Sequence, residues 1–102
     1  MQRAQTINVE DLVKRAEGAA AEHRARLPGT PHVGCDPDGC TLGIIIPDWQ
    51  MADVDFRSLY ETSVSLAKAI GGPDVTPSLM VRPGRITMGY FARDALLLKA
   101  LM

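Results

Sequence analysis

The chain has 102 residues, of which 46% are hydrophobic and 23% charged, and its formal net charge is −1. A chain of this length can bury one modest core, so we expect a single domain over residues 1–102. The composition is that of an average soluble globular protein, and so small a net charge gives no reason to expect nucleic acid as a partner.

The N-terminal stretch and the cysteine content predict a cytoplasmic protein. Residues 1–5 contain no apolar core of the length that a signal peptide needs. No apolar run reaches the roughly 18 residues of a membrane span, so we expect no membrane association. Thiols are usually reduced in the cytoplasm, and the two cysteines are therefore expected to be thiols and not a disulfide.

Residues 7–27 are predicted to form the first helix. Asn8 is a suitable N-cap, and Glu10 and Asp11 lie in the first turn, where negative charge is favourable. Apolar residues recur at helical spacing after this start. The Pro-Gly pair at 28–29 is expected to end the helix.

The next stretch, residues 31–49, is predicted to form a β-hairpin around which the rest of the fold is organised. Its second arm, residues 41–46, is short, apolar and rich in β-branched residues, which is typical of a central strand buried on both faces. Residues 36–39 have the sequence Asp-Pro-Asp-Gly, which favours a tight turn. We therefore expect Cys35 and Cys40 to flank this turn as near-opposite neighbours.

Residues 53–70 are predicted to form the second helix, with Asp53 as its cap and a glycine pair at 71–72 as its end. One face of this helix carries most of its apolar side chains, among them Phe56 and Tyr60.

From Ser78 the hydrophobic pattern changes to a period of two, which predicts a second hairpin. Leu79, Val81, Ile86 and Met88 would share one face, with Met80, Arg82 and Thr87 on the other. The Pro-Gly pair at 83–84 favours a type II turn, which is not the type that two-residue hairpins prefer. We therefore expect a wider or bulged connection.

The last stretch, residues 92–102, is apolar at too many positions for one helical stripe. Its leucine and alanine content favours a helix, and a strand over residues 96–101 is the alternative. Either form would leave apolar side chains without cover, which invites a second copy of the chain. The residues expected at that interface are Leu97, Leu98, Leu101 and Met102.

Together these elements predict an α+β fold: an antiparallel sheet from two β-hairpins with helices on one face, in the order α-β-β-α-β-β and a final helix. If the last element is a strand, the fold would be a roadblock-like α/β sandwich. Its element order would then resemble that of the roadblock family of small dimerising regulators, in which a hairpin also follows a helix and a Pro-Gly. The resemblance brings no functional residues to this chain.

His32, Cys35 and Cys40 form the one group with metal-ligand character. Structural zinc sites repeat a closely spaced cysteine pair, and this chain has a single pair, so we expect no metal and no cofactor. Cys35 and His32 are also the pair best suited to thiol catalysis. Because the neighbouring aspartates disfavour a reactive thiolate, we assign no catalytic residue.

Arg82 and Arg85 flank the second turn, and two guanidinium groups at a hairpin tip are suited to binding a carboxylate or phosphate. Trp49 is either a core anchor or a contact residue, and we include it in the expected interface because tryptophan is enriched at binding hot spots.

The sequence therefore predicts a small interaction or regulatory protein that binds a protein partner, including a second copy of itself, and has no catalysis of its own. Two alternatives stay open. One is a small-molecule or anion-binding module using Arg82 and Arg85, and the other is a small enzyme acting through Cys35 and His32.

Overall fold

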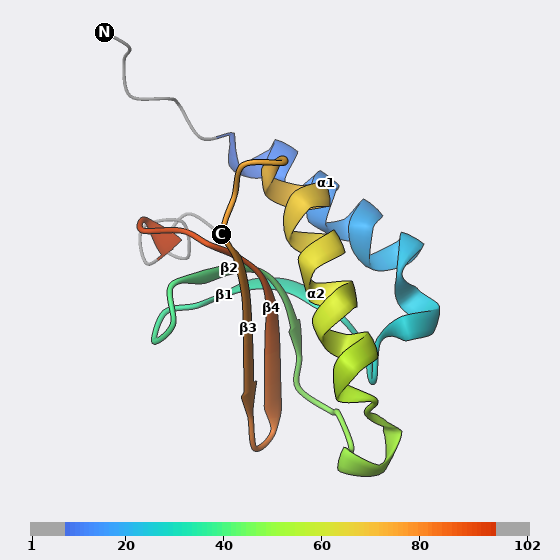
Figure 1. Ribbon diagram of the computed structural model, residues 1–102. Coiled ribbons are helices and arrows are strands. Elements are labelled where there is room, and N and C mark those ends of the chain that lie inside the picture. The colour runs from blue at the N-terminus through green and yellow to red at the C-terminus, as the bar shows by residue number, and fades with distance from the viewer. Residues whose placement is uncertain (1–7, 96–102) are drawn as a thin grey trace, which may run out of the picture.

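The computed structural model describes residues 8–95 of the chain. The helices are α1 (Val9–Glu22) and α2 (Phe56–Gly71), and the strands are β1 (His32–Asp36), β2 (Thr41–Ile46), β3 (Pro77–Arg82) and β4 (Arg85–Phe91) (Figure 1). Two short 3-10 helices, η1 (Arg24–Arg26) and η2 (Met51–Asp53), precede β1 and α2. The predicted α+β fold and its order α-β-β-α-β-β are confirmed.

The four strands form one antiparallel sheet in the order β1-β2-β4-β3, and both helices cover the same face (Figure 1). The shared core contains Ala16, Ala19 and Ala20 of α1, Leu59, Leu66 and Ile70 of α2, and Ile44, Ile46, Ile86 and Met88 of the two central strands. As predicted, β2 is a central strand and is buried along nearly its whole length. Neither helix within residues 8–95 has the length and apolarity that crossing a membrane would require.

The first helix begins as predicted and ends earlier than predicted. The side chain of Asn8 accepts a hydrogen bond from the backbone N–H of Asp11 at 3.1 Å, which caps α1. The α-helix stops at Glu22, because residues 24–26 tighten into η1. The expected end near Leu27 is therefore wrong by about one and a half turns.

The second helix is capped by Asp55 and not by Asp53. Residues 51–53 form η2, so the helix starts three residues later than expected. The carboxylate of Asp55 accepts hydrogen bonds from the N–H groups of Arg57 and Ser58, at 3.1 and 3.4 Å. Both aspartates are good capping residues, and only the path of the chain before the helix decides between them.

The two hairpin turns also differ from the expected ones. In the first, Asp36 pairs with Thr41, so Cys40 lies within the turn and Cys35 pairs with Leu42. The expected near-opposite placement of the two cysteines is therefore wrong. In the second, residues 82 and 85 pair directly, which makes a two-residue connection in place of the wider one expected. Proline fixes φ near −65° and Gly84 has φ 76°, the combination of the type II turn that the sequence favours.

The sheet curls where two glycines face each other on the central strands. Gly43 and Gly89 are direct partners, and a Cβ atom on either would collide with backbone atoms of the opposite strand. This close approach lets the β1–β2 hairpin bend out of the plane of β3 and β4. The tips of the two hairpins point in different directions in Figure 1. The tip of the β1–β2 hairpin thereby comes to lie over the sheet face that the helices leave open.

Two contacts confirm how far the sheet bends. Asp36 lies in register with Thr41 and Phe91, whereas Thr87 is four residues away along β4, which is about 13 Å in a flat sheet. Yet Thr87 Oγ1 donates a hydrogen bond to Asp36 Oδ2 at 3.2 Å. At the hairpin tip, the thioether of Met80 occupies the space that a Cβ of Gly39 would need.

Candidate functional site

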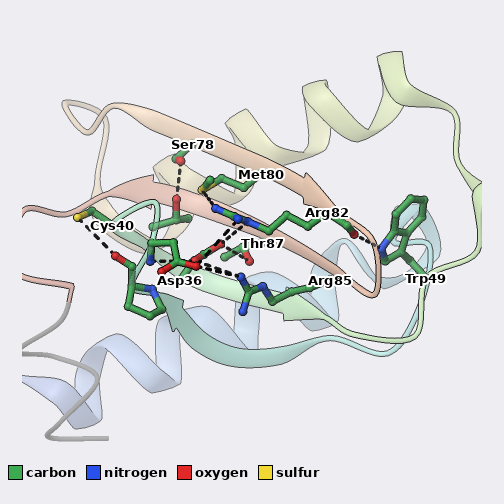
Figure 2. A network of polar contacts seen from close by, with 11 residues as sticks. Asp36, Cys40, Trp49, Ser78, Met80, Arg82, Arg85 and Thr87 are labelled. Atoms are coloured by element: carbon green, nitrogen blue, oxygen red, sulfur yellow. Dashed lines mark hydrogen bonds and ion pairs between the residues drawn. The ribbon is translucent and has the colours of Figure 1, made fainter.

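The bent sheet encloses a polar network centred on Asp36, whose side chain has no exposed surface (Figure 2). The two sequence-predicted arginines converge on this carboxylate from the second hairpin. Arg85 Nη2 lies 3.5 Å from Asp36 Oδ1, and Arg82 Nε lies 3.6 Å from Oδ2. The hydroxyl of Thr87 and the backbone N–H of Asp38 complete the surroundings of the carboxylate, at 3.2 Å each.

The charges of this network balance within the chain. Asp38 lies at the hairpin tip with 69% of its side chain exposed, and its Oδ2 is 3.9 Å from Arg85 Nη2 and 4.0 Å from Arg82 Nη1. Two carboxylates therefore face two guanidinium groups, each of which is about one-third exposed. The Nε atoms of both arginines are buried without a hydrogen-bond partner. The place that an external anion would take between the arginines is thus held by Asp36.

The network fixes the β1–β2 hairpin onto the rest of the sheet. The hydroxyls of Thr41 and Ser78 are hydrogen-bonded to each other across the fold. Trp49 is half-buried against the core, and its Nε1–H donates to the backbone carbonyl of Arg82 at 3.0 Å, as Figure 2 shows. These contacts join residues far apart in the sequence, which is what a structural clamp requires. We call the side chains of Asp36, Arg82, Arg85 and Thr87 the hairpin clamp.

The other chemically active side chains are not brought together. His32 is exposed at the start of β1, whereas Cys35 is buried in a small cluster with Leu42 and Ala95 on the side of the helices. Because side chains alternate along a strand, His32 and Cys35 point to opposite faces of the sheet. Within residues 8–95 no three His, Cys, Asp or Glu side chains are grouped so that they could hold a metal ion.

Large apolar side chains are exposed along one flank of α2. Phe56 and Tyr60, one turn apart, have 48% and 62% of their surface exposed. The flank with Ser58 lines a hollow against η1 and Pro28, so Phe56 and Tyr60 lie on the opposite flank. Gly71, which is in line with Tyr60 on the helix, packs close to Tyr90 and Val75 near the start of β3. The end of α2 therefore lies next to the start of β3, and Phe56 and Tyr60 lie on the flank of α2 that faces away from η1.

Strand β3 is an edge strand of the sheet that residues 8–95 form. The N–H of Phe91 bonds to the carbonyl of Thr76, so even-numbered residues of β3 bond to β4. The odd-numbered residues Leu79 and Val81 consequently turn their N–H and C=O groups outward. No strand within residues 8–95 pairs with that edge. Val81, 40% exposed, lies beside it.

We call this combination the α2–β3 surface: Phe56, Tyr60 and Val81 together with the outward backbone groups of β3. Sequence reasoning missed it because the helical period assigned Phe56 and Tyr60 to the buried face. The position of α2 relative to the sheet reveals it, because a helix near the rim of a sheet has a narrower stripe of its surface covered. Four of the five predicted interface residues, Leu97, Leu98, Leu101 and Met102, lie outside the described residues, and the fifth, Trp49, packs against the core.

Comparisons of the chain with protein-family models, with curated proteins and with solved structures give no match in any of the three.

Proposed function

We propose that this chain acts by binding protein, including a second copy of itself, through the α2–β3 surface, and that it carries out no catalysis of its own. The observations that support this most directly are the exposure of Phe56, Tyr60 and Val81 and an edge of β3 with which no strand within residues 8–95 pairs. Tyrosine is enriched at binding hot spots, and open edges are the sites at which proteins accept an added strand. The cytoplasmic setting expected from the sequence is part of this proposal.

The alternative of an anion-binding module is less well supported by the same geometry. Asp36 and Asp38 already supply the two negative charges that Arg82 and Arg85 face. An added phosphate or carboxylate would have to displace one of them. We therefore propose that the hairpin clamp is structural. The alternative of an enzyme using Cys35 and His32 lacks support because the two side chains point to opposite sides of the sheet.

The experiment that tests the proposed function compares two serine variants by sedimentation velocity. Phe56→Ser combined with Tyr60→Ser removes the aromatic side chains of the α2–β3 surface, and should raise the dissociation constant of the dimer at least tenfold. Phe91→Ser is the matched control, because Phe91 is similarly exposed and lies on the other face of the sheet. Equal effects of the two changes would contradict the proposal.

The C-terminal residues expected from the sequence provide a competing location for the same contact. Leu97→Ala combined with Leu101→Ala should weaken the dimer by several kcal/mol if the tail is the interface, since burying each leucine is worth roughly 1.5–3 kcal/mol. If the α2–β3 surface is the interface, the same pair of changes should leave the dissociation constant within about threefold.

A further inference from the structure

We infer that the partner at the α2–β3 surface is a second copy of this chain. The two β3 strands pair antiparallel about a two-fold axis that passes between the two copies of Met80. This inference rests on the proposed function and specifies its geometry. The result is one continuous sheet in which the four strands of each copy meet at β3. A two-fold contact of this kind is closed, because each surface meets its own copy.

The backbone of β3 selects this register among the possible ones. With Met80 opposite Met80 of the second copy, Leu79 lies opposite Val81 of the second copy on both sides of the axis. These are the residues with outward N–H and C=O groups, so about four backbone hydrogen bonds form. A register shifted toward the start of β3 would bring Pro77 into the pairing. Proline has no N–H, so the two copies would form fewer backbone hydrogen bonds.

The side chains agree with the same register. Leu79 and Val81 lie on the helix-covered side of the sheet. There, Leu79 of each copy would form an apolar cross-strand pair with Val81 of the other copy. On the open side, Arg82 would lie opposite Ser78 of the second copy, so that no two like charges face each other directly. Val81, which is 40% exposed in the single chain, would become covered.

The helices fit the spacing that this sheet imposes. α2 lies mainly over β4 and then over β3, so its axis stands about one to one and a half strand spacings away from the two-fold axis. The two copies of α2 would then be about 10–14 Å apart, which large side chains on the facing flanks can span. The flank that faces the second helix is the one bearing Phe56 and Tyr60, which are otherwise exposed to solvent.

Charge complementarity along α2 supports the same axis. Gly71 packs against Tyr90, the register partner of Pro77, so the end of α2 is level with the start of β3. Met80 is about 10 Å further along β3, which corresponds to the level of Val64 on the helix. An axis at this level brings Glu61 near Lys68 of the second copy, and the reverse pair follows by symmetry. Both side chains are exposed in the single chain.

The other edge of the sheet, at β1, is lined by charged groups among the residues that the structure describes. The space between β1 and α1 is lined by Glu17, Arg24 and His32 among smaller residues. A second copy placed there would bury charged groups, which costs free energy unless each finds a partner. The last described residue of the chain, Ala95, also packs on this side, against Cys35 and Leu42. The β3 edge is therefore the one that fits a second copy.

The test removes one outward backbone N–H group of β3 and leaves the hydrogen bonds between β3 and β4 intact. Val81→Pro removes the outward N–H at position 81 in both copies, while even-numbered residues keep their bonds to β4. Val81→Thr is the matched control, since it keeps the N–H and a β-branched side chain. Sedimentation equilibrium should show a dimer dissociation constant at least tenfold higher for Val81→Pro, and a change within about threefold for Val81→Thr.

A cross-link provides a second measurement that does not depend on the stability of the proline variant. In a chain carrying Cys35→Ala and Cys40→Ser, Met80→Cys would place two thiols at a non-hydrogen-bonded pair about 4.5 Å apart by Cα, within disulfide range. Mild oxidation should give a covalent dimer. Ser78→Cys is the control, because the two copies of residue 78 would be about 14 Å apart in this register.

The outcomes separate the two proposals. A dimer that survives Val81→Pro, or that cross-links through residue 78 and not through residue 80, overturns this register while leaving the proposed function standing. A wild-type chain that stays monomeric at all concentrations overturns both. A dimer that is lost on Leu97→Ala and Leu101→Ala and is insensitive to Val81→Pro assigns the contact to the tail and contradicts the inference.

Discussion

Replacing the buried carboxylate of the hairpin clamp should destabilise the fold strongly. Asp36→Asn keeps the shape of the side chain and removes its charge. The carboxylate now accepts hydrogen bonds from Thr87 Oγ1 and the N–H of Asp38, and lies within 3.6 Å of both arginines. An amide has one acceptor oxygen in place of two, so it loses one of these hydrogen bonds and both ion pairs.

The expected cost follows from these contacts. One buried hydrogen bond is worth about 1 kcal/mol. Breaking a fully buried ion pair costs 3–5 kcal/mol, but the arginines here are about one-third exposed, so the charge loss should cost only about 1–2 kcal/mol. We therefore expect the free energy of unfolding to fall by about 2–3 kcal/mol. For a chain of this size, that lowers Tm by about 10–20 °C.

Urea unfolding followed by circular dichroism measures the effect, at one fixed protein concentration because any dimer adds to the apparent stability. Asp38→Asn is the matched control, since its exposed carboxylate lies 3.9–4.0 Å from the same arginines and should contribute less than about 0.5 kcal/mol. If the two asparagine variants unfold at the same urea concentration, Asp36 does not hold the hairpin in the way described.

Two further predictions concern the bend of the sheet and the response to acid. Gly89→Ala should lower the free energy of unfolding by more than about 3 kcal/mol, because its Cβ would meet the backbone of β2. Gly18→Ala, on the open side of α1, should raise the free energy of unfolding by up to about 1 kcal/mol. Similar urea midpoints for the two variants would refute the close approach of the two strands at Gly89. The backbone N–H of Thr30 holds the pKa of Asp48 below its ordinary value, so its stabilisation is present above the unfolded pKa and is lost as the pH falls through the folded pKa. Asp48→Asn should therefore show a shallower loss of Tm between about pH 4 and pH 2 than the unchanged chain, and parallel curves would contradict this.

The fold was predictable where local patterns and burial agree. The apolar run at 41–46 indicates a central strand because such a run can only be covered on both faces, and the structure confirms it. The alternation from Leu79 to Met88 likewise assigns the two faces of the second hairpin correctly. Both patterns are visible within a few residues of sequence, although the contacts that bury them are long-range, which is why a single sequence carries them.

The hairpin clamp could not be predicted in the same way. Asp36 belongs to a turn sequence, where an exposed aspartate is the ordinary expectation. Its burial depends on the pairing of Gly43 with Gly89, 46 positions apart in the chain, and on the curl that this pairing permits. The partners Arg82 and Arg85 were identified as a pair suited to a carboxylate, but the sequence does not reveal that the carboxylate belongs to the chain itself.

The same limit applies to the α2–β3 surface. The helical period groups Phe56 with Leu59 and Ile70, of which only the last two are buried, because the width of the covered stripe of a helix depends on what lies beneath it. α2 lies over β4 and the edge strand β3, and Phe56 and Tyr60, on its flank away from η1, stay exposed. Only the strand order reveals which flank this is.

The central claim is that the chain pairs with a second copy of itself, and multi-angle light scattering of the unmodified protein tests it most directly. One chain has a mass of 11.0 kDa. Over loading concentrations from about 1 to 500 μM, we expect the weight-average mass to rise toward twice that value and to stop there, because a two-fold contact is closed. A mass that stays at one chain over the whole range would contradict the account.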